Sequence, residues 1–247
     1  MPSHTQSGSS APPEPSFRGS NPASLSLLIE SLCPAGVAAA ELRTPGNPAL
    51  LHPEEAQSIA HAIAKRAREF AAGRHCAHLA LERLGVPPAA LRAAPDRRPL
   101  WPSGVVGSIT HTQGFCAAAA ARTERLIALG IDTELAGAVS AELRPSICTP
   151  GELAWLDTLP LTQQGSAATL IFCAKEAFYK CQYPDTFEWV SFKDVEVCPR
   201  EWGMSTGRFT LEAQRPLKFF AAHPSLALHT AYRFHEEFIS VVMALAV

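Results

Sequence analysis

The sequence predicts an α+β, mixed α/β fold, and three observations lead to this class. Short apolar runs of strand length alternate with longer segments of helical periodicity along the 247-residue chain. Hydrophobic residues make up 47% of the chain and charged residues only 18%, so the chain can bury the core of one large or two small domains. The formal net charge of −2 excludes a generally basic nucleic-acid binder.

The N-terminal segment and the cysteines indicate a cytoplasmic protein with a tail. Residues 1–22 are rich in Ser, Pro and Gly, and we expect a disordered extension, because they cannot bury enough surface to offset the entropy of ordering. They lack the basic and apolar regions of a secretory signal. No apolar stretch reaches the roughly 20 residues of a membrane span. The seven cysteines form no CxxC pair, which indicates free thiols in a reducing compartment.

The individual elements follow from apolar periodicity and from Gly and Pro breaks. The first predicted helix runs from Glu54 to about Leu84, because Pro53 and acidic residues open it and Gly85 ends it. Ile59, Ile63, Ala67 and Phe70 recur at helical spacing, and Gly73 interrupts this pattern. The remaining strands are predicted at Val105–Thr110, Phe115–Ala121, Arg125–Glu134, Val190–Val197, Gly207–Leu211 and Phe238–Val247, and the remaining helices at Leu153–Leu156 and Ala167–Cys181.

An acidic pair ends one of these predicted strands. Asp132 and Glu134 stand two residues apart, so they share one face of the strand, while Ile131 and Thr133 point the other way. Two carboxylates on one face offer oxygen ligands to a hard cation such as Mg²⁺. The alternative is a solvated strand end that is acidic by chance.

The predicted helix after this strand carries a second charged pair. Glu176 and Lys180 are four residues apart and therefore neighbours on the helix surface. Glu176 is a candidate metal ligand or general base, and Lys180 a candidate phosphate contact. A simple surface ion pair, worth a few tenths of a kcal/mol, is the alternative.

Several basic residues precede the acidic pair. His111 follows a strand in a segment rich in Gly, Ser and Thr, where it can donate to a phosphate oxygen or act as a structural hydrogen bonder. Arg74 and Arg98 lie beside Gly or Pro breaks, where a ligand can approach. The other charges of the first helix spread around its axis, which is typical of a solvated helix.

The order of these weak signals is specific. The segments VGSITH (106–111), LGIDTE (129–134) and FCAKEAFYK (172–180) follow one another, with about 40 residues between the last two. This set resembles the 4′-phosphopantetheinyl transferase superfamily in its larger, monomeric type. The segments GRHCAHLALERLG (73–85) and RPLWPSGVVGSITHTQGFCAAA (98–119) are most similar to the enterobactin-synthesis branch.

The resemblance implies a fold and a reaction. The fold would be a pseudo-dimer of two similar α/β halves, residues 23–128 and 129–247, with coenzyme A in the cleft between them. Phosphopantetheine would pass from coenzyme A to a serine of an apo acyl, peptidyl or aryl carrier protein, releasing adenosine 3′,5′-bisphosphate. Candidate pathways are siderophore and other nonribosomal peptide, polyketide and fatty acid synthesis.

The resemblance also implies residue roles. Mg²⁺ would be held by Asp132, Glu134 and Glu176, with Asp132, Glu176 and Lys180 as catalytic residues. Coenzyme A would be contacted by Arg68, Arg74, Arg98, Thr110, His111, Lys175 and Lys180. Two alternatives remain open: a Mg²⁺-dependent phosphohydrolase that acts on coenzyme A or nucleotides, and a non-catalytic protein that binds coenzyme A or a carrier domain.

Overall fold

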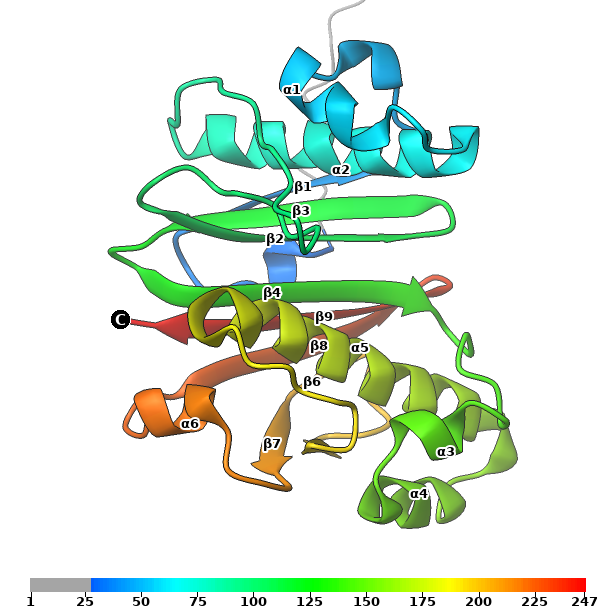
Figure 1. The fold of residues 1–247 in the computed structure, drawn as a ribbon. Coiled ribbons are helices and arrows are strands. Elements are labelled where there is room, and N and C mark those ends of the chain that lie inside the picture. The colour runs from blue at the N-terminus through cyan, green and yellow to red at the C-terminus, as the bar shows by residue number, and fades with distance from the viewer. Residues whose placement is uncertain (1–27) are drawn as a thin grey trace, which may run out of the picture.

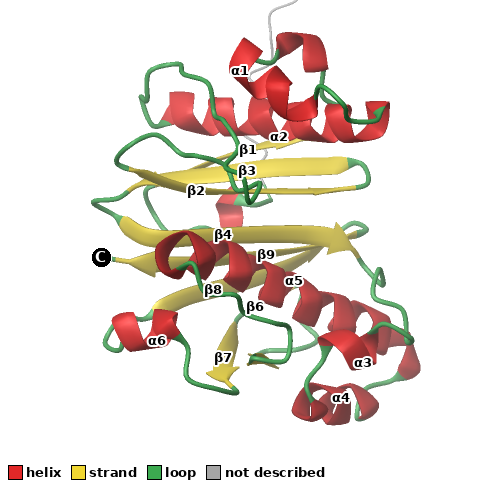
Figure 2. Ribbon diagram, viewed as in Figure 1, coloured by secondary structure: helices red, strands yellow, loops and turns green. Residues whose placement is uncertain are grey.

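The computed structural model describes residues 28–247, so the predicted extension over residues 1–22 lies outside the described residues. Four layers follow one another: helix α2, a three-stranded sheet, a four-stranded sheet and helix α5 (Figure 1). Figure 2 shows the two sheets face to face between the two long helices. The mixed α/β fold of two similar halves, each a long helix on an antiparallel sheet, is confirmed.

The first half packs α2 (Ala64–Arg83) on a sheet of order β1-β3-β2. Its strands are β1 (Val37–Leu42), β2 (Val105–Thr112) and β3 (Phe115–Arg122). Alanines 117–121 of β3 are fully buried. Small side chains on both faces of a strand let a helix approach one face and a second sheet the other, so this run accounts for the close layering.

The second half packs α5 (Leu161–Thr186) on a sheet of order β4-β9-β8-β6. Its strands are β4 (Leu126–Leu135), β6 (Thr206–Gly207), β8 (Leu228–His235) and β9 (Phe238–Ala246). Gly130 of β4 lies directly under α5: a Cβ there would sit 1.9 Å from the main-chain oxygen of Ala177. Glycine therefore permits the contact that brings the strand's acidic end beside the helix.

Smaller elements complete the second half and precede α2 in the first half. The hairpin of β5 (Val195–Pro199) and β7 (Phe209–Ala213) extends below the main sheet. The short helices are α1 (Pro53–Ala56), α3 (Arg144–Ile147), α4 (Pro150–Asp157) and α6 (Lys218–Ala222), with 3-10 turns at Glu30–Leu32, Pro48–Leu50 and Gln57–Ile59.

The predicted helix from Glu54 to Leu84 is wrong as a single element. The chain forms α1 and a 3-10 turn, and then starts α2 only at Ala64, after Ile63 takes an extended conformation. The side chain expected to continue the apolar stripe, Ile63, is 74% exposed. Gly73 does not interrupt α2, since its missing side chain leaves room for Ile109 of β2, 3.0 Å from where a Cβ would stand.

The other predicted elements differ mainly in extent. The strand expected over Val190–Val197 begins only at Val195, and β1 and β8 were not predicted. The strand Phe238–Val247 is confirmed as β9. Residue 128 lies inside β4, and the chain passes between the two sheets at residues 123–125, so the division of the halves at 128/129 remains a prediction. No helix of the described residues is long and apolar enough to cross a membrane, and all seven cysteines carry free thiols.

Candidate active site

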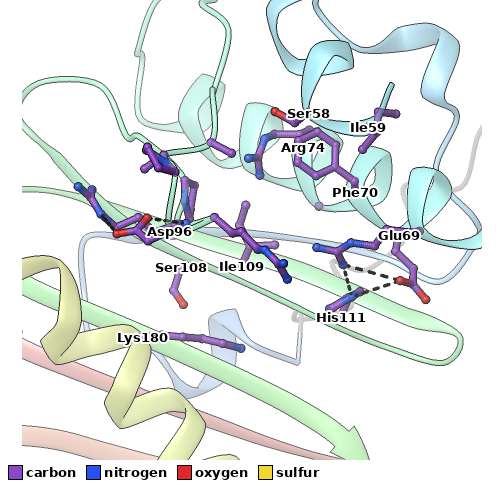
Figure 3. A pocket seen from close by; sticks show the side chains of 18 of the residues that line it. Ser58, Ile59, Glu69, Phe70, Arg74, Asp96, Ser108, Ile109, His111 and Lys180 are labelled. Atoms are coloured by element: carbon purple, nitrogen blue, oxygen red, sulfur yellow. Dashed lines mark hydrogen bonds and ion pairs between the residues drawn. The ribbon is translucent and has the colours of Figure 1, made fainter. Parts of the chain in front are cut away.

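A cavity of about 1190 Å³ lies between the two halves (Figure 3). Helix α2 and the loop over residues 93–101 line one side, and the C-terminal part of α5 lines the other. Strand β2 forms the floor between them with Ser108, Ile109 and His111. The sequence-predicted pseudo-dimer cleft is therefore a real cavity with walls from both halves.

The acidic end of β4 meets α5 on the second half's side of this cavity. Lys180 Nζ donates to Asp132 Oδ1 at 2.6 Å and to the main-chain oxygen of Ile131 at 3.2 Å. Asp132 is buried, and the Lys180 side chain is partly exposed. Burial lowers the pKa of the Lys180 ammonium, but Asp132 and Glu176 outweigh it and raise that pKa above its ordinary value. Lys180 is therefore a fixed cation at this side of the cavity.

The second carboxyl oxygen of Asp132 is left without a hydrogen bond in the described part of the chain. Its Oδ2 is buried and makes no hydrogen bond with any described residue. An unpaired carboxylate oxygen in the interior costs free energy, so a ligand that supplies positive charge or a donor would stabilise it. This atom is the strongest indication in the structure of a cation beside β4.

The other two predicted metal ligands lie near Asp132. Burial, more than the neighbouring charge of Asp132, raises the pKa of both Glu134 and Glu176 above that of an ordinary glutamate. The three carboxylates do not converge into a closed set, since the described residues bring three such ligand atoms within 4.8 Å only at Glu196, Cys198 and Glu212. An open arrangement is compatible with Mg²⁺, which keeps several waters and substrate oxygens.

The opposite wall is basic. Arg66, Phe70, Gly73 and Arg74 follow one face of α2 and line the cavity. The Arg74 guanidinium stacks over the Phe70 ring at 4.3 Å from its centroid, and its buried Nε has no hydrogen-bond partner among the described residues. Burial lowers the pKa of Arg74 to about 10, which still leaves it charged at neutral pH. An anion in the cavity would satisfy this arginine.

His111 lies at one end of the cavity floor. Its Nε2 is 3.1 Å from Arg66 Nη1 and 3.5 Å from Glu69 Oε2, as the dashed lines of Figure 3 show. Burial lowers the pKa of His111, and Arg66 and Lys180 add to this effect. The lowered pKa favours the neutral ring, whose single N–H can be donated to an anion in the cavity.

The loop over residues 93–101 joins the halves at the cavity mouth. Arg98 pairs with Asp96 through Nε at 3.1 Å, and its guanidinium lies 5.0 Å from the ring centroid of Phe187, just beyond α5. Trp101 covers Gly107 of β2, where a Cβ would lie 2.5 Å from the indole. The loop's position thus depends on a glycine in the floor.

Two family models cover most of the described chain. The N-terminal domain of 4′-phosphopantetheinyl transferases matches residues 54–121, and the 4′-phosphopantetheinyl transferase superfamily matches residues 128–234. Over 170 residues the chain is 41% identical to the 4′-phosphopantetheinyl transferase Npt of Nocardia iowensis, which covers 69% of this chain and 76% of that protein. The chain belongs to the 4′-phosphopantetheinyl transferase family.

Other relatives agree with this membership. The 4′-phosphopantetheinyl transferase PptT of Mycobacterium tuberculosis is 40% identical over 69% of this chain and 76% of its own length. Enterobactin synthase component D of Salmonella typhi is 39% identical over a shorter region, 47% of this chain and 48% of that protein. This chain is accordingly a transferase that moves phosphopantetheine from coenzyme A to a carrier protein.

Among solved structures, the holo-(acyl-carrier-protein) synthase of Bacillus anthracis in complex with coenzyme A (3′,5′-ADP) matches 49% of this chain and 97% of that chain, with a TM-score of 0.38 and 21% identity. The corresponding enzyme of Thermotoga maritima has a TM-score of 0.39 at 22% identity, and the match covers 49% of this chain and 63% of that one.

Five of the ten residues predicted for the transferase site line the cavity: Arg74, Arg98, His111, Glu176 and Lys180. Asp132 and Glu134 adjoin it through Lys180 and β2. The hydroxyl of Thr110 is buried and bonds Asp132 rather than facing the cavity.

Two predicted coenzyme A contacts lie elsewhere. Arg68 does not line the cavity, because it lies on a different face of α2 from Arg66 and Arg74. The Lys175 ammonium is 1% exposed and donates to three acceptors: Glu152 Oε2 at 2.6 Å and the main-chain oxygens of Ile147 and Phe192. All three of its protons are used inside the second half, so Lys175 has no donor left for a ligand.

Other cavity residues were not predicted. Arg66 follows the helical spacing of Arg74, so the sequence contained the signal for it. The aromatic residues Tyr179, Tyr183 and Trp189 line the wall of the second half, where Tyr179 and Tyr183 stack at 5.0 Å. Their spacing of four residues on α5 indicates a shared face, but only the tertiary structure shows that this face is open to a ligand.

Proposed function

We infer that this transferase binds coenzyme A in the cavity between its halves and requires Mg²⁺ held by Asp132, Glu134 and Glu176. The observation that carries the proposal is the distribution of charge in one cavity: arginines and a histidine from the first half face Glu176 and Lys180 of the second. Coenzyme A carries a 3′-phosphate and a pyrophosphate, so a ligand with two separated anionic groups matches this distribution. The orphaned Oδ2 of Asp132 supports the metal.

The metal ligands fit Mg²⁺ by their chemistry. All three are carboxylates, the oxygen donors that hard cations prefer. Burial makes the charged forms of Glu134 and Glu176 unfavourable, and a bound cation would offset that cost. When bound, Mg²⁺ would supply positive charge against the charge that develops on the pyrophosphate oxygens. The Asp132 oxygen that Lys180 does not use is the one available to it.

The basic residues of this chain bind and orient coenzyme A. Arg74, with Arg66 and Arg98, holds the 3′-phosphate, because their guanidinium groups offer planar donors to phosphate oxygens. His111 and Lys180 donate to the pyrophosphate. Arg68 has no part in this binding, and Lys175 acts only within the second half.

Glu176 is the base in this scheme. The serine oxygen of the carrier forms a bond to the β-phosphorus, its proton passes to the Glu176 carboxylate, and the bond to the leaving adenosine 3′,5′-bisphosphate breaks. Burial raises the pKa of Glu176 and makes the carboxylate a stronger base than an exposed one. Lys180 stays charged and stabilises the transferred phosphate.

The partners follow from this reaction. Apo acyl, peptidyl and aryl carrier domains are the proposed acceptors, and the similarity to enterobactin synthase component D supports a carrier of siderophore synthesis as one of them. The free thiols support a reducing cytoplasm. A monomer is proposed because the cavity already receives walls from both halves of one chain.

Intact-mass spectrometry of a panel of apo carriers, incubated with this protein, coenzyme A and Mg²⁺, tests the proposal. We expect a phosphopantetheine mass gain on the carrier serine that a chelator abolishes and that a folded Asp132→Ala variant does not produce. A gain that persists with the chelator would reject the metal. Coenzyme A cleaved without carrier modification would indicate a phosphohydrolase, and coenzyme A bound without either reaction a non-catalytic protein.

A further inference from the structure

Two edge strands meet at the seam between the halves, and no backbone ladder joins them. Strand β2 ends the first sheet and β4 ends the second. The free main-chain N–H groups of β4 are satisfied by β2 side chains: Ile131 N donates to Ser108 Oγ at 3.1 Å, and Thr133 N donates to Thr110 Oγ1 at 3.0 Å. Hydroxyl groups at alternate positions of β2 thus replace the missing ladder.

The Thr110 hydroxyl both accepts and donates a hydrogen bond at the seam. Its oxygen already accepts from Thr133 N, and the hydroxyl donates to Asp132 Oδ1 at 3.2 Å. Lys180 donates to the same oxygen at 2.6 Å. Two donors on Oδ1 fix the rotation of the carboxyl group and leave Oδ2 as its only unpartnered oxygen.

Thr112, one position further along the same face of β2, repeats this arrangement. Its hydroxyl donates to Glu134 Oε2 at 2.7 Å. Each of the two carboxylates of β4 therefore has its own threonine of β2, two residues apart on both strands. Although burial raises the pKa of Glu134, this hydrogen bond opposes the effect and favours the charged carboxylate.

We propose that Thr110 and Thr112 are positioning residues for the metal ligands: their hydroxyls, supplied by the first half, orient Asp132 and Glu134 of the second half for the cation. Outer hydrogen bonds of this kind orient ligating carboxylates, and their loss costs about 10–100-fold in metal affinity. The inference rests on the Mg²⁺ site of the proposed function, and it adds that the first half takes part in metal binding without contributing a ligand.

The experiment measures metal binding apart from turnover. Mn²⁺ is titrated into the full chain with coenzyme A and no carrier protein, and free Mn²⁺ is counted by electron paramagnetic resonance. For Thr112→Val we expect a Kd for Mn²⁺ raised about 10-fold or more, with coenzyme A affinity in the absence of metal unchanged. Thr112→Ser keeps the hydroxyl and should restore the wild-type Kd.

A matched control separates positioning from stability. Thr133 lies between Asp132 and Glu134 but points to the other face of β4, where its hydroxyl pairs with Ser240 Oγ at 2.8 Å. Thr133→Val removes a buried hydroxyl from the same strand, so it should lower the melting temperature yet leave the Mn²⁺ affinity unchanged. Thr110→Val should lower both, because it also leaves the Thr133 N–H without its acceptor.

The outcomes separate this inference from the function on which it rests. Wild-type affinity in Thr112→Val, with a Mn²⁺ site present in the wild type, would refute the positioning role and leave the metal-dependent transferase intact. An equal loss of affinity in Thr133→Val would also refute it, because the effect would then follow stability. A wild-type chain that binds no Mn²⁺ with coenzyme A would overturn the metal site itself, and the inference with it.

Discussion

Substituting Lys175 by Met removes the cation of a buried ion pair without removing side-chain volume. The Lys175 and Glu152 side chains are 1% and 0% exposed, and Nζ lies 2.6 Å from Glu152 Oε2. Glu152 also accepts main-chain N–H bonds from Thr149 at 2.7 Å and Val197 at 2.6 Å. The pair therefore joins α5 to the start of α4 and to β5, and its loss should loosen all three.

The expected cost follows from what the substitution leaves behind. Lys175→Met leaves Glu152 charged and buried, and it deprives two main-chain oxygens of their donor. Breaking a buried pair in this way costs about 3–5 kcal/mol. At roughly 2–4 °C per kcal/mol for a chain of this size, the melting temperature should fall by about 6–20 °C.

Urea denaturation followed by tryptophan fluorescence measures this cost. The midpoint should fall with little change in the slope, since the surface exposed on unfolding is nearly the same. Adding Glu152→Gln to Lys175→Met should recover part of the loss, because no charge then remains buried and the amide oxygen still accepts a main-chain N–H bond. A Lys175→Met variant as stable as the wild type would refute the buried-pair argument.

The same variant decides between two roles for Lys175. At a temperature where Lys175→Met is folded, its affinity for adenosine 3′,5′-bisphosphate should equal that of the wild type, because Nζ donates only to protein acceptors. A 10-fold loss of affinity in the folded variant would instead support the direct coenzyme A contact that the family resemblance implied.

Three further predictions concern the cavity and the helix above it. Arg74→Ala should weaken adenosine 3′,5′-bisphosphate binding by about 1.5–3 kcal/mol, measured by calorimetry, whereas Arg68→Ala should leave it unchanged; equal losses would contradict the assignment of the α2 face. Glu176→Gln should abolish transfer yet stabilise the fold at pH 7. The raised pKa of Glu176 means that the folded state binds more protons than the unfolded state, so the stability of the wild type falls as pH rises above the pKa of an unfolded glutamate. The difference in melting temperature between Glu176→Gln and the wild type should therefore shrink toward pH 4. A difference that stays constant with pH would contradict a free-energy cost of burying the Glu176 charge. Gly130→Ala should prevent α5 from packing on β4, because the added Cβ would lie 1.9 Å from the Ala177 oxygen. Thermal unfolding followed by far-ultraviolet circular dichroism measures the effect, and a melting temperature equal to that of the wild type would contradict this prediction.

The acidic side of the site was predictable because it depends on local periodicity. Alternation along a strand places Asp132 and Glu134 on one face, and a spacing of four along a helix brings Lys180 beside Glu176; in the structure both pairs lie at the same seam. The fold class could be predicted for the same reason. These patterns need no knowledge of what packs against the element.

The misses depend on tertiary contacts. Half of strand β1 is alanine, a weak strand former, and the segment becomes a strand through pairing with β3. Lys175 has no local partner that would reveal its direction, since Glu152 lies on another helix. The exposed Ile63 continues an apolar pattern in the sequence, but the start of α2 at Ala64 leaves it outside the helix.

Arg66 differs from these cases, because its signal was present in the sequence. Positions 66, 70, 73 and 74 share one face of a helix, while position 68 falls almost opposite to 66. Charges spread around a helix axis indicate a solvated helix when nothing is known of its surroundings. Once one side of the helix is known to be buried, the charges on the other sides can be assigned separately. Alanine-rich packing of α2 against β3 fixes its buried side, and the cavity then separates Arg66 from Arg68.

The division of charge between the halves gives the seam a role in activity as well as in stability. The first half supplies the arginines and His111, the second supplies the carboxylates and Lys180, and the seam hydroxyls connect the two. The arginines proposed for the phosphates and the carboxylates proposed for the cation therefore come from different halves. A change that loosens the contact of β2 with β4 should therefore reduce metal binding and transfer, because the relative position of the two sheets decides the geometry of the site.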